Sequence, residues 1–391
     1  MNQNEKYFVS LMSSYLNRTN PPQAGKDTDW AAIYELSAIH NVAAITADQV
    51  LKLEQGSLPD EETLSKFRQQ IGYTVIDAAE KEETAAFIKD FMRAGNMDFI
   101  FIKGAVLRNY YPIKEFRTGS DTDVIIRQED FAKCRTLFEA KGYDIKTDGF
   151  NGFSVSYKNQ HIEIHSTLDY DNPVFENIFD MCEKNANEYL IKKEYHLLYV
   201  LCHIIKHFNH CGAGIKMFMD IDVLLRSTDN FDYEEFMALC RKINIETFAK
   251  ASFALCRYWF NTPVDSDLDL REFADFRELF ETEIIKSGSF GFHSRDLGDY
   301  YINKGIGGSG KNSAAAKLKA LLFLIFPPKK DLARKYGYLN KKPYLLPVAW
   351  ISRLCAAVFS RNSHSRSTVK AILHTGSESE QYKKLLKELN I

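Results

Sequence analysis

The sequence predicts an α+β protein in which a small mixed β-sheet lies between helical regions at both ends of the chain. Residues 1–95 and 174–290 carry apolar side chains at the three- and four-residue spacing of amphipathic helices. Residues 96–170 instead contain short apolar runs separated by turn-forming glycine and asparagine. With 391 residues, of which 45% are hydrophobic, the chain is long enough for two or three domains with hydrophobic cores.

The sheet region predicts an order of strand, helix, strand, helix and three more strands. Lys103-Gly104 ends the first strand, Pro112 stops the first helix, and Gly142 is a plausible C-cap of the second. In chain order, the predicted elements are strands at 97–102 and 122–127, helices at 105–111 and 128–140, and strands at 143–146, 153–158 and 161–168.

Composition excludes several classes of protein. The seven cysteines are scattered and form no Cys-x-x-Cys pair, which argues against a disulfide framework and a structural zinc site. No run reaches the roughly 18 to 20 apolar residues that span a bilayer, and the first residues do not resemble a signal peptide. We therefore expect a soluble protein of the reducing cytoplasm.

The most informative segment is Asp121-Thr-Asp123-Val-Ile-Ile, where two acids precede an apolar strand. Side chains two apart on a strand share a face, so both carboxylates point the same way. On the last predicted strand, Glu163 lies between two isoleucines and faces the same side as His161 and His165. Three such carboxylates favour magnesium or manganese, and such sites serve phosphoryl and nucleotidyl transfer. By itself, an Asp-x-Asp is more often an ordinary loop.

Lys103-Gly104 is a candidate phosphate-binding turn. Glycine allows close approach of the backbone to a phosphate, and Lys103 adds a positive charge. The helix that follows directs free amide groups at an anion. The alternative interpretation is a plain strand-to-helix turn.

Together these motifs resemble the uncharacterised bacterial nucleotidyltransferase family of the DNA polymerase β-like superfamily. The resemblance rests on Lys-Gly after a strand, Arg117-x-x-x-Asp-x-Asp, and a strand ending Glu163-x-His. It extends to the His-x-x-Lys-His helix at 198–207 and to the helix that contains Asp220. It implies that Asp121, Asp123 and Glu163 bind the metal and that Lys103-Gly104 replaces the Gly-Ser turn usual in the superfamily.

The resemblance and the composition together predict four regions. They are a helical N-terminal region (1–95), a nucleotidyltransferase core (96–185), a helical region completing the nucleotide cleft (186–300) and a basic helical C-terminal region (301–391). Residues 304–372 contain fourteen lysines and arginines and one acid, which leaves −15 on the rest of the chain. This polarity predicts either an anionic partner or docking onto the acidic remainder.

The helix at 194–210 places four histidines near one face. The absence of a His-Glu-x-x-His pattern argues against a zinc site. Two interpretations remain: a structural face, or a wall of the nucleotide cleft in which His203, Lys206 and His207 meet the phosphates and Asp220 orients one of them. The predicted nucleotide contacts are Lys103, Gly104, Arg117, Ser120, His203, Lys206 and His207.

Two C-terminal features have simpler explanations than their appearance suggests. Gly305–Ser313 resembles a P-loop, but Asn312 stands where Ser or Thr should bind magnesium, so a loop capped by Ser313 is the better interpretation. The apolar runs at 318–326 and 344–359 predict core helices, with an interfacial membrane contact as the alternative.

The sequence therefore predicts an enzyme that uses Mg²⁺ or Mn²⁺ to move a nucleoside monophosphate from a nucleoside triphosphate to a hydroxyl of an acceptor. The acceptor classes compatible with the sequence are a small molecule, a sugar, a peptide and RNA. Two alternatives are an inactive nucleotide-binding module of the same fold and a nucleic-acid or membrane binder that acts through its basic tail.

Overall fold

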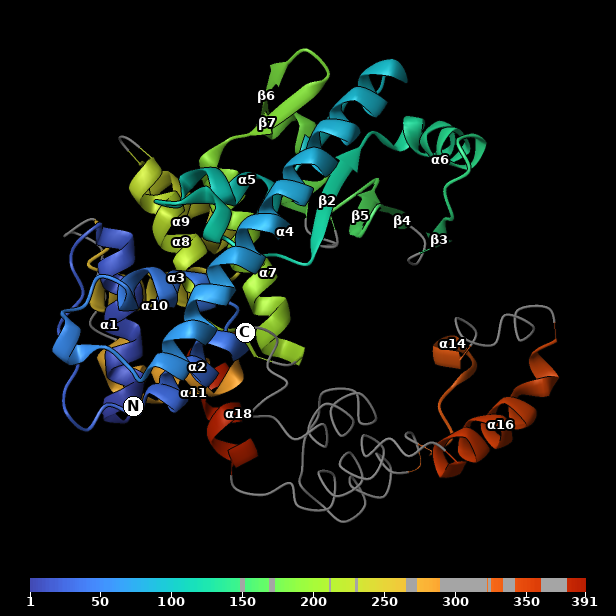
Figure 1. The fold of residues 1–391 in the computed structure, drawn as a ribbon. Coiled ribbons are helices and arrows are strands. Elements are labelled where there is room, and N and C mark those ends of the chain that lie inside the picture. The colour runs from blue at the N-terminus through green and yellow to red at the C-terminus, as the bar shows by residue number, and fades with distance from the viewer. Residues whose placement is uncertain are drawn as a thin grey trace.

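The computed structural model describes residues 1–147, 152–168, 173–210, 212–228, 231–264 and 273–288, with shorter stretches at 322, 325–332, 342–359 and 378–391. Over these residues, a mixed β-sheet lies between two groups of helices (Figure 1). The predicted α+β class, with a mixed sheet between helical regions, is confirmed.

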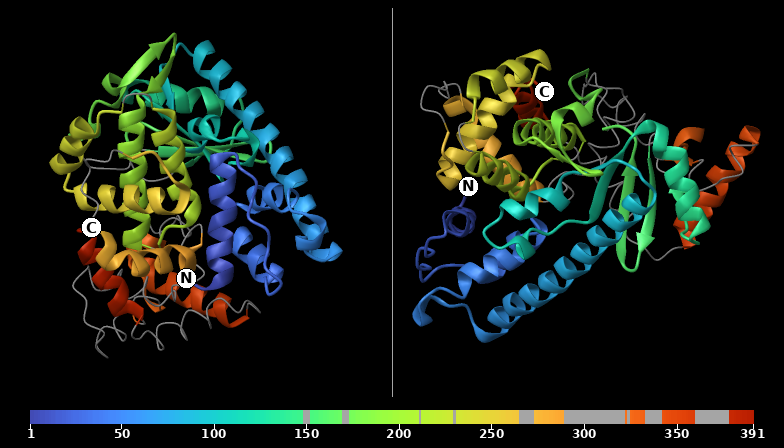
Figure 2. Two further views of the ribbon diagram at one scale, coloured as in Figure 1. Left: turned by 90° about the vertical axis from the view of Figure 1, so that its left-hand side faces the viewer. Right: turned by 90° about the horizontal axis from the view of Figure 1, so that it is seen from above.

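Four helices precede the sheet, and the fourth joins the two halves of the molecule. The helices are α1 (Gln3–Asn17), α2 (Trp30–Ile39), α3 (Ala43–Val50) and α4 (Glu61–Ala94). The side chain of Asp60 caps α4 by accepting the amide of Thr63. Early in α4, Phe67 packs into the helical core, whereas Ile88 and Phe91 pack under the sheet. Figure 2 shows α4 running lengthwise past the sheet.

The sheet has seven strands in the order β3-β4-β5-β2-β1-β7-β6. β2 pairs in parallel with β5, and β1 pairs in parallel with β7, while the other neighbours are antiparallel. The strands are β1 (Phe99–Phe101), β2 (Asp121–Ile126), β3 (Lys146–Thr147), β4 (Gly152–Tyr157), β5 (Gln160–His165), β6 (Cys182–Asn185) and β7 (Glu188–Ile191).

Several predicted elements differ from the structure. The helix predicted at 105–111 is only α5 (Gly104–Leu107), followed by a 3₁₀ turn at Arg108–Tyr110. The helix predicted at 128–140 begins with a 3₁₀ turn and becomes α6 at Phe131–Ala140. The hairpin β6–β7 was missed, because the region from 174 onward was predicted to be helical.

The two faces of the sheet belong to different hydrophobic clusters. Val124 and Ile126 of β2 face α4 and α6, together with Ile162 and Ile164 of β5. Ile125 faces the other way and joins the large cluster built with the C-terminal helices. Because side chains alternate along a strand, Asp121 and Asp123 lie on the same side as Ile125. The acidic face is therefore the one turned toward those helices.

The helices after the sheet close over the acidic face (Figure 1). Helices α7, α8, α10 and α11 share the large cluster with α1 and α3, and so does the C-terminal helix α18. The bounds are α7 (Lys193–His210), α8 (Ile215–Ser227), α9 (Tyr233–Lys242), α10 (Glu246–Phe260), α11 (Phe273–Ser287) and α18 (Glu378–Glu388).

Most of the basic segment at 304–372, and all of the P-loop-like stretch Gly305–Ser313, lie outside the described residues. Within the segment, α14 (Lys329–Leu332) and α16 (Leu346–Phe359) contribute to a small hydrophobic cluster of their own. In the described part of the chain, no helix is both long and apolar enough to cross a bilayer.

Candidate functional site

Two neighbouring parallel strands bring the predicted acids together. The β2–β5 register pairs Asp123 directly with Glu163, and Asp121 with His161. Ligand atoms of Asp123, Glu163 and His165 all lie within 4.8 Å of one another. Asp121, two residues before Asp123 on β2, is not part of that group. Its carboxylate accepts a 2.8 Å hydrogen bond from Ser120. The structure therefore adds His165 to the predicted acids at this point.

Cations surround Asp123, which is almost fully buried. Lys103 Nζ lies 2.6 Å from Asp123 Oδ1, and His165 Nε2 lies 3.5 Å from the same oxygen and 3.4 Å from Glu163 Oε2. Burial alone would raise the pKa of Asp123, but His165 and Lys103 hold it well below its usual range. Burial works against a charged His165, yet its two carboxylate contacts raise the pKa of His165 to about 9.

Asp121 has the opposite electrostatic character. Burial raises the pKa of the Asp121 carboxyl, and the neighbouring carboxylates of Glu163 and Asp123 raise it further, against the hydrogen bond from Ser120. An acid that is crowded by like charges gains when a cation binds beside it. The strand therefore presents one well-neutralised acid and one that lacks a fixed cationic partner among the described residues.

The turn between β1 and α5 holds Lys103 in an unusual conformation. Its φ of 50° and ψ of −126° lie in a region that favours glycine. At the next residue, Gly104, an added Cβ would lie 2.3 Å from Arg117 Nη1, so a side chain there would require the guanidinium to move. Since α5 has only four residues, its dipole is weaker than the predicted seven-residue helix would supply.

Arg117 is fixed from behind by a buried acid on α8. Its Nε and Nη2 donate to the carboxylate of Asp220 at 3.2 and 2.8 Å, and the Tyr111 hydroxyl donates to the same carboxylate at 2.8 Å. Asp220 therefore orients Arg117. The prediction that Asp220 orients a residue of the histidine helix is wrong. With Nε and Nη2 engaged, Nη1 is left facing the Gly104 turn.

A cleft of about 490 Å³ lies in front of these groups. Its walls include eight predicted residues: Lys103, Gly104, Arg117, Ser120, Asp121, Asp123, His203 and His207. Glu163 and Lys206 are not among its lining residues. The cleft also contains residues that the sequence analysis did not single out, notably Asp77 and Lys216.

The two cleft histidines contact each other. His203 Nε2 and His207 Nε2 are 3.2 Å apart, one helical turn apart on α7. Burial, together with the nearby charge of Lys103, holds the pKa of His203 well below its usual range. A neutral His203 can share a hydrogen with His207 and can donate to or accept from a ligand. His196, predicted to lie near the same face, is fully buried and does not line the cleft.

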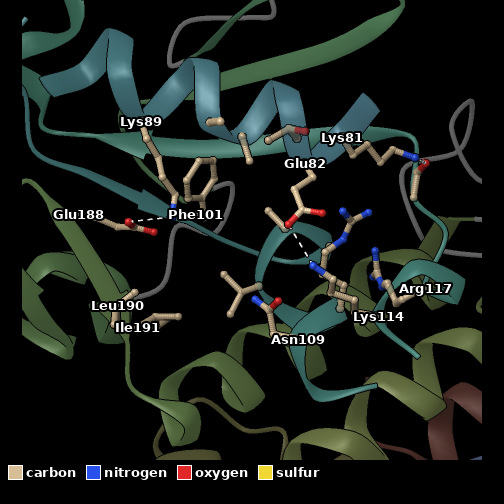
Figure 3. Close-up of a pocket in the computed structure, with 18 of the residues that line it drawn as sticks. Lys81, Glu82, Lys89, Phe101, Asn109, Lys114, Arg117, Glu188, Leu190 and Ile191 are labelled. Carbon is tan, nitrogen blue, oxygen red and sulfur yellow. Dashed lines mark hydrogen bonds and ion pairs between the residues drawn. The ribbon is translucent and has the colours of Figure 1, made fainter. Parts of the chain in front are cut away.

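A second cavity of about 470 Å³ lies behind the turn, between α4, α5 and β7 (Figure 3). It shares Gly104, Arg117, Gly119 and Asp121 with the cleft. Its lysines are paired across the cavity: Lys89 with Glu188 and Lys114 with Glu82, each at 2.9 Å (Figure 3). The Gly104–Arg117 contact forms the wall between the two cavities.

The donor set at β2 and β5 fits a divalent cation. Carboxylate oxygens suit magnesium and manganese, and an imidazole nitrogen makes manganese the better match. Asp123 and Glu163, with His165, already have ligand atoms close enough to share one ion. The ammonium of Lys103 lies against Asp123 Oδ1 and lines the same cleft.

One comparison with known proteins identifies a family for this chain. A family model described as an uncharacterised nucleotidyltransferase matches residues 26–261, more than half of the chain. Among solved structures, the chain is similar to the Megavirus polyadenylate synthase, with 14% identity and a TM-score of 0.30. That match covers 52% of this chain and 50% of the viral one, so it spans about half of each. No curated protein shows a significant match.

Proposed function

Because this chain belongs to the uncharacterised nucleotidyltransferase family, we propose that it transfers a nucleoside monophosphate from a nucleoside triphosphate to a hydroxyl of an acceptor and releases pyrophosphate. One observation carries the proposal. Asp123 and Glu163 lie side by side on parallel strands, and Asp123 faces a cleft whose other walls supply Lys103, Arg117 and Lys216. Carboxylates that can bind a metal and cations that can bind phosphates therefore line one cavity.

Each side chain has a role that follows from its position. Asp121, Asp123 and Glu163, joined by His165 after loss of its proton, would hold Mg²⁺ or Mn²⁺, which when bound polarises the reacting phosphate. Lys103, which pairs with Asp123 and lines the cleft, would bind the triphosphate beside Gly104. Glu163 lies at the edge of the buried site and can accept the proton of the acceptor hydroxyl. Arg117 Nη1, beside Gly104, stabilises negative charge as the pyrophosphate leaves.

The test uses nucleoside triphosphates labelled at the α-phosphate or at the γ-phosphate, with Mg²⁺ or Mn²⁺ and candidate hydroxyl acceptors. Wild type should transfer the α-label and release the γ-label in pyrophosphate. Asp121→Asn, Asp123→Asn and Glu163→Gln should each lower this transfer at least about 100-fold. Asp98→Asn is the matched control, because Asp98 pairs with Arg127 outside the cleft.

Three results would count against nucleotidyl transfer. Release of the γ-label as orthophosphate would indicate hydrolysis, and appearance of the γ-label on the acceptor would indicate phosphoryl transfer. Tight binding of nucleotide without any label transfer, over sugars, small metabolites, peptides and RNA, would favour the binding-module alternative. The four-region division of the chain and a cytoplasmic location remain predictions from the sequence.

A further inference from the structure

Two buried lysines hold successive carbonyl groups of the loop that leads to Asp121. Lys216 Nζ on α8 donates to the Thr118 carbonyl at 3.2 Å, and Lys81 Nζ on α4 donates to the Gly119 carbonyl. Only 9% of Lys216 and 7% of Lys81 is exposed. The two ammonium groups approach the loop from different cavities: Lys216 lines the cleft, and Lys81 lines the second cavity (Figure 3).

The two lysines differ in how their charge is balanced. Lys81 also donates to the carboxylate of Asp77, which neutralises it. For Lys216, no carboxylate of the described residues lies within 4 Å, and the hydrogen bond to Thr118 is the single one recorded. The nearby acid Asp220 is already engaged by Arg117 and Tyr111. An ammonium has three donors, and a buried charge is costly without a partner.

Burial and two nearby cations disfavour the charged form of Lys216, so its ammonium would be stabilised by a bound anion. Burial lowers the pKa of Lys216 to about 7, and the positive charges of Arg117 and Lys81 act in the same direction. Asp220 and Asp121 oppose this effect but do not reverse it. Lys216 therefore has two unused donors, no paired acid and a place in the cleft wall.

We propose that Lys216 binds the phosphate chain of the nucleotide, at the β- and γ-phosphates that leave as pyrophosphate. This role rests on the proposed function, because it assigns the anion that such a reaction brings into the cleft. The ammonium faces the same cavity as Gly104 and Arg117, which places it among the other phosphate contacts. Through Thr118, it also connects the bound anion to the loop that positions Asp121.

The direct test measures binding of inorganic pyrophosphate, with Mn²⁺ present, by titration calorimetry. Lys216→Gln keeps a donor for the Thr118 carbonyl but removes the charge, and should weaken binding about 10- to 100-fold. Lys216→Arg should recover part of that loss. Lys81→Gln is the matched control, since it removes the other loop-holding lysine from outside the cleft, and its affinity should stay within about threefold of wild type.

Three outcomes would overturn the assignment. One is that Lys216→Gln binds pyrophosphate as tightly as wild type. Another is that Lys81→Gln loses as much affinity as Lys216→Gln, which would show that both lysines only brace the loop. Failure of Lys216→Arg to recover any affinity, while folded, would also contradict a charge-based role. Circular dichroism and gel filtration establish folding, and Lys216→Met serves as a second variant if Lys216→Gln does not fold.

Proton uptake supplies a readout that a bracing role would not change. Above pH 7 the free lysine is largely neutral, and a bound anion raises its pKa, so wild type should take up a fraction of a proton at pH 8. Calorimetry in buffers of different ionisation enthalpy measures this uptake. Lys216→Gln should take up less, whereas Lys81→Gln, which keeps the Lys216 amine, should still take up a proton. The other titratable groups that line the cleft are common to all three proteins: Asp77, Lys103, Arg117, Asp121, Asp123, His203, His207 and Asp220.

The proposed function and this assignment can fail separately. If no label is transferred but pyrophosphate binding depends on Lys216, the cleft is an anion site and the proposed reaction is wrong. If label is transferred while Lys216→Gln leaves pyrophosphate affinity unchanged, the reaction stands and Lys216 is structural.

Discussion

At the scale of single residues, Lys103 shows how the site stores strain. A non-glycine residue with φ 50° and ψ −126° costs of order 1–3 kcal/mol. The conformation turns the Lys103 ammonium onto Asp123 Oδ1, 2.6 Å away. Glycine would adopt the same backbone without strain but would supply no charge. The chain has a charged lysine at this strained position instead of glycine, which fits a binding role for Lys103.

We therefore predict that Lys103→Gly and Lys103→Ala differ in stability although both lose the ammonium. Lys103→Ala keeps the strain, and so should unfold about 1 kcal/mol more easily than Lys103→Gly. Both should lose nucleotide affinity to a similar degree. Urea unfolding at pH 7 measures the difference, and equal midpoints would show that the turn relaxes at no cost.

His196 makes folding sensitive to acid. Burial lowers the pKa of His196 to about 4, and its Nε2 is buried without a hydrogen-bond partner. The unfolded chain binds this proton below about pH 6.5, but the folded chain does so only near pH 4, so stability falls as the pH falls between these values. From pH 7 to pH 5, wild type should lose about 2 kcal/mol more than His196→Met. Urea unfolding of both proteins at the two pH values measures this, and parallel losses would contradict it.

At this scale, strand alternation was enough to predict that Asp121 and Asp123 share one face of their strand, and that Glu163 shares a face with His161 and His165. The spacing of Ile162 and Ile164 likewise predicted the orientation of Glu163. Sequence could not predict that His165 would contact both Asp123 and Glu163, because that depends on the register of β2 against β5. Lys216 was missed for a similar reason, since a lysine in an amphipathic helix looks like a solvent-exposed residue until the helix is docked.

At the scale of elements, the sequence pattern did not predict the hairpin β6–β7. Residues 186–187 form its two-residue loop, and Ala186 adopts a φ of 55° where Asn-Gly or Asp-Gly usually signals a turn. β6 is mostly exposed and lacks alternation, so only Tyr189 and Ile191 of β7 show buried strand positions. Helix α7, in contrast, was predicted at 194–210, and α8 and α10 lie within the region at 174–290 that was predicted to be helical.

Helix α8 offers a matched pair of buried acids with different consequences. Asp220 holds Arg117 at the cleft, whereas Asp222, two residues on, pairs with Arg226 and Thr262 away from it. Asp220→Asn should cost about 3–5 kcal/mol, because Arg117 would remain buried without its acid. Asp222→Asn should also destabilise the fold, but by less, since Arg226 is partly exposed.

Function should separate these two variants. Under conditions in which both variants are folded, Asp220→Asn should weaken nucleotide binding by about tenfold or more, because Arg117 loses its orientation. Asp222→Asn should bind nucleotide as wild type does. Titration with a non-hydrolysable nucleoside triphosphate measures both, and equal losses would mean that helix stability alone controls the cleft.

At the scale of the whole molecule, one hydrophobic cluster joins segments from both ends of the described chain. It includes Phe8 of α1, Ile125 of β2, Phe208 of α7 and Leu385 of α18. The four regions expected from sequence are therefore not four separate cores. Sequence could identify the helices but not this sharing, since the contacts join residues as far apart in the chain as His40 and Ile285, which are separated by 245 positions.

The C-terminal helix α18 is the sharpest test of that shared core. Leu385 and Leu389 are fully buried, and the Tyr382 hydroxyl donates to the carbonyl of Phe208 on the histidine helix α7. Replacing either leucine by alanine should cost about 2–5 kcal/mol, whereas Lys384→Ala and Lys387→Ala on the exposed side should stay within about 0.5 kcal/mol.

The loss should appear in one unfolding transition, because α18 packs on α11 and on α7, which carries His203 and His207. Near- and far-ultraviolet circular dichroism should give coincident curves for Leu385→Ala, at a lower urea midpoint than wild type. Nucleotide should raise that midpoint in both proteins, since it binds only the folded cleft. The contrary result is that α18 unfolds first and the nucleotide-dependent shift of the remaining transition stays unchanged. The helix would then be peripheral, and the cleft would depend only on the core formed by α7, α8 and the sheet.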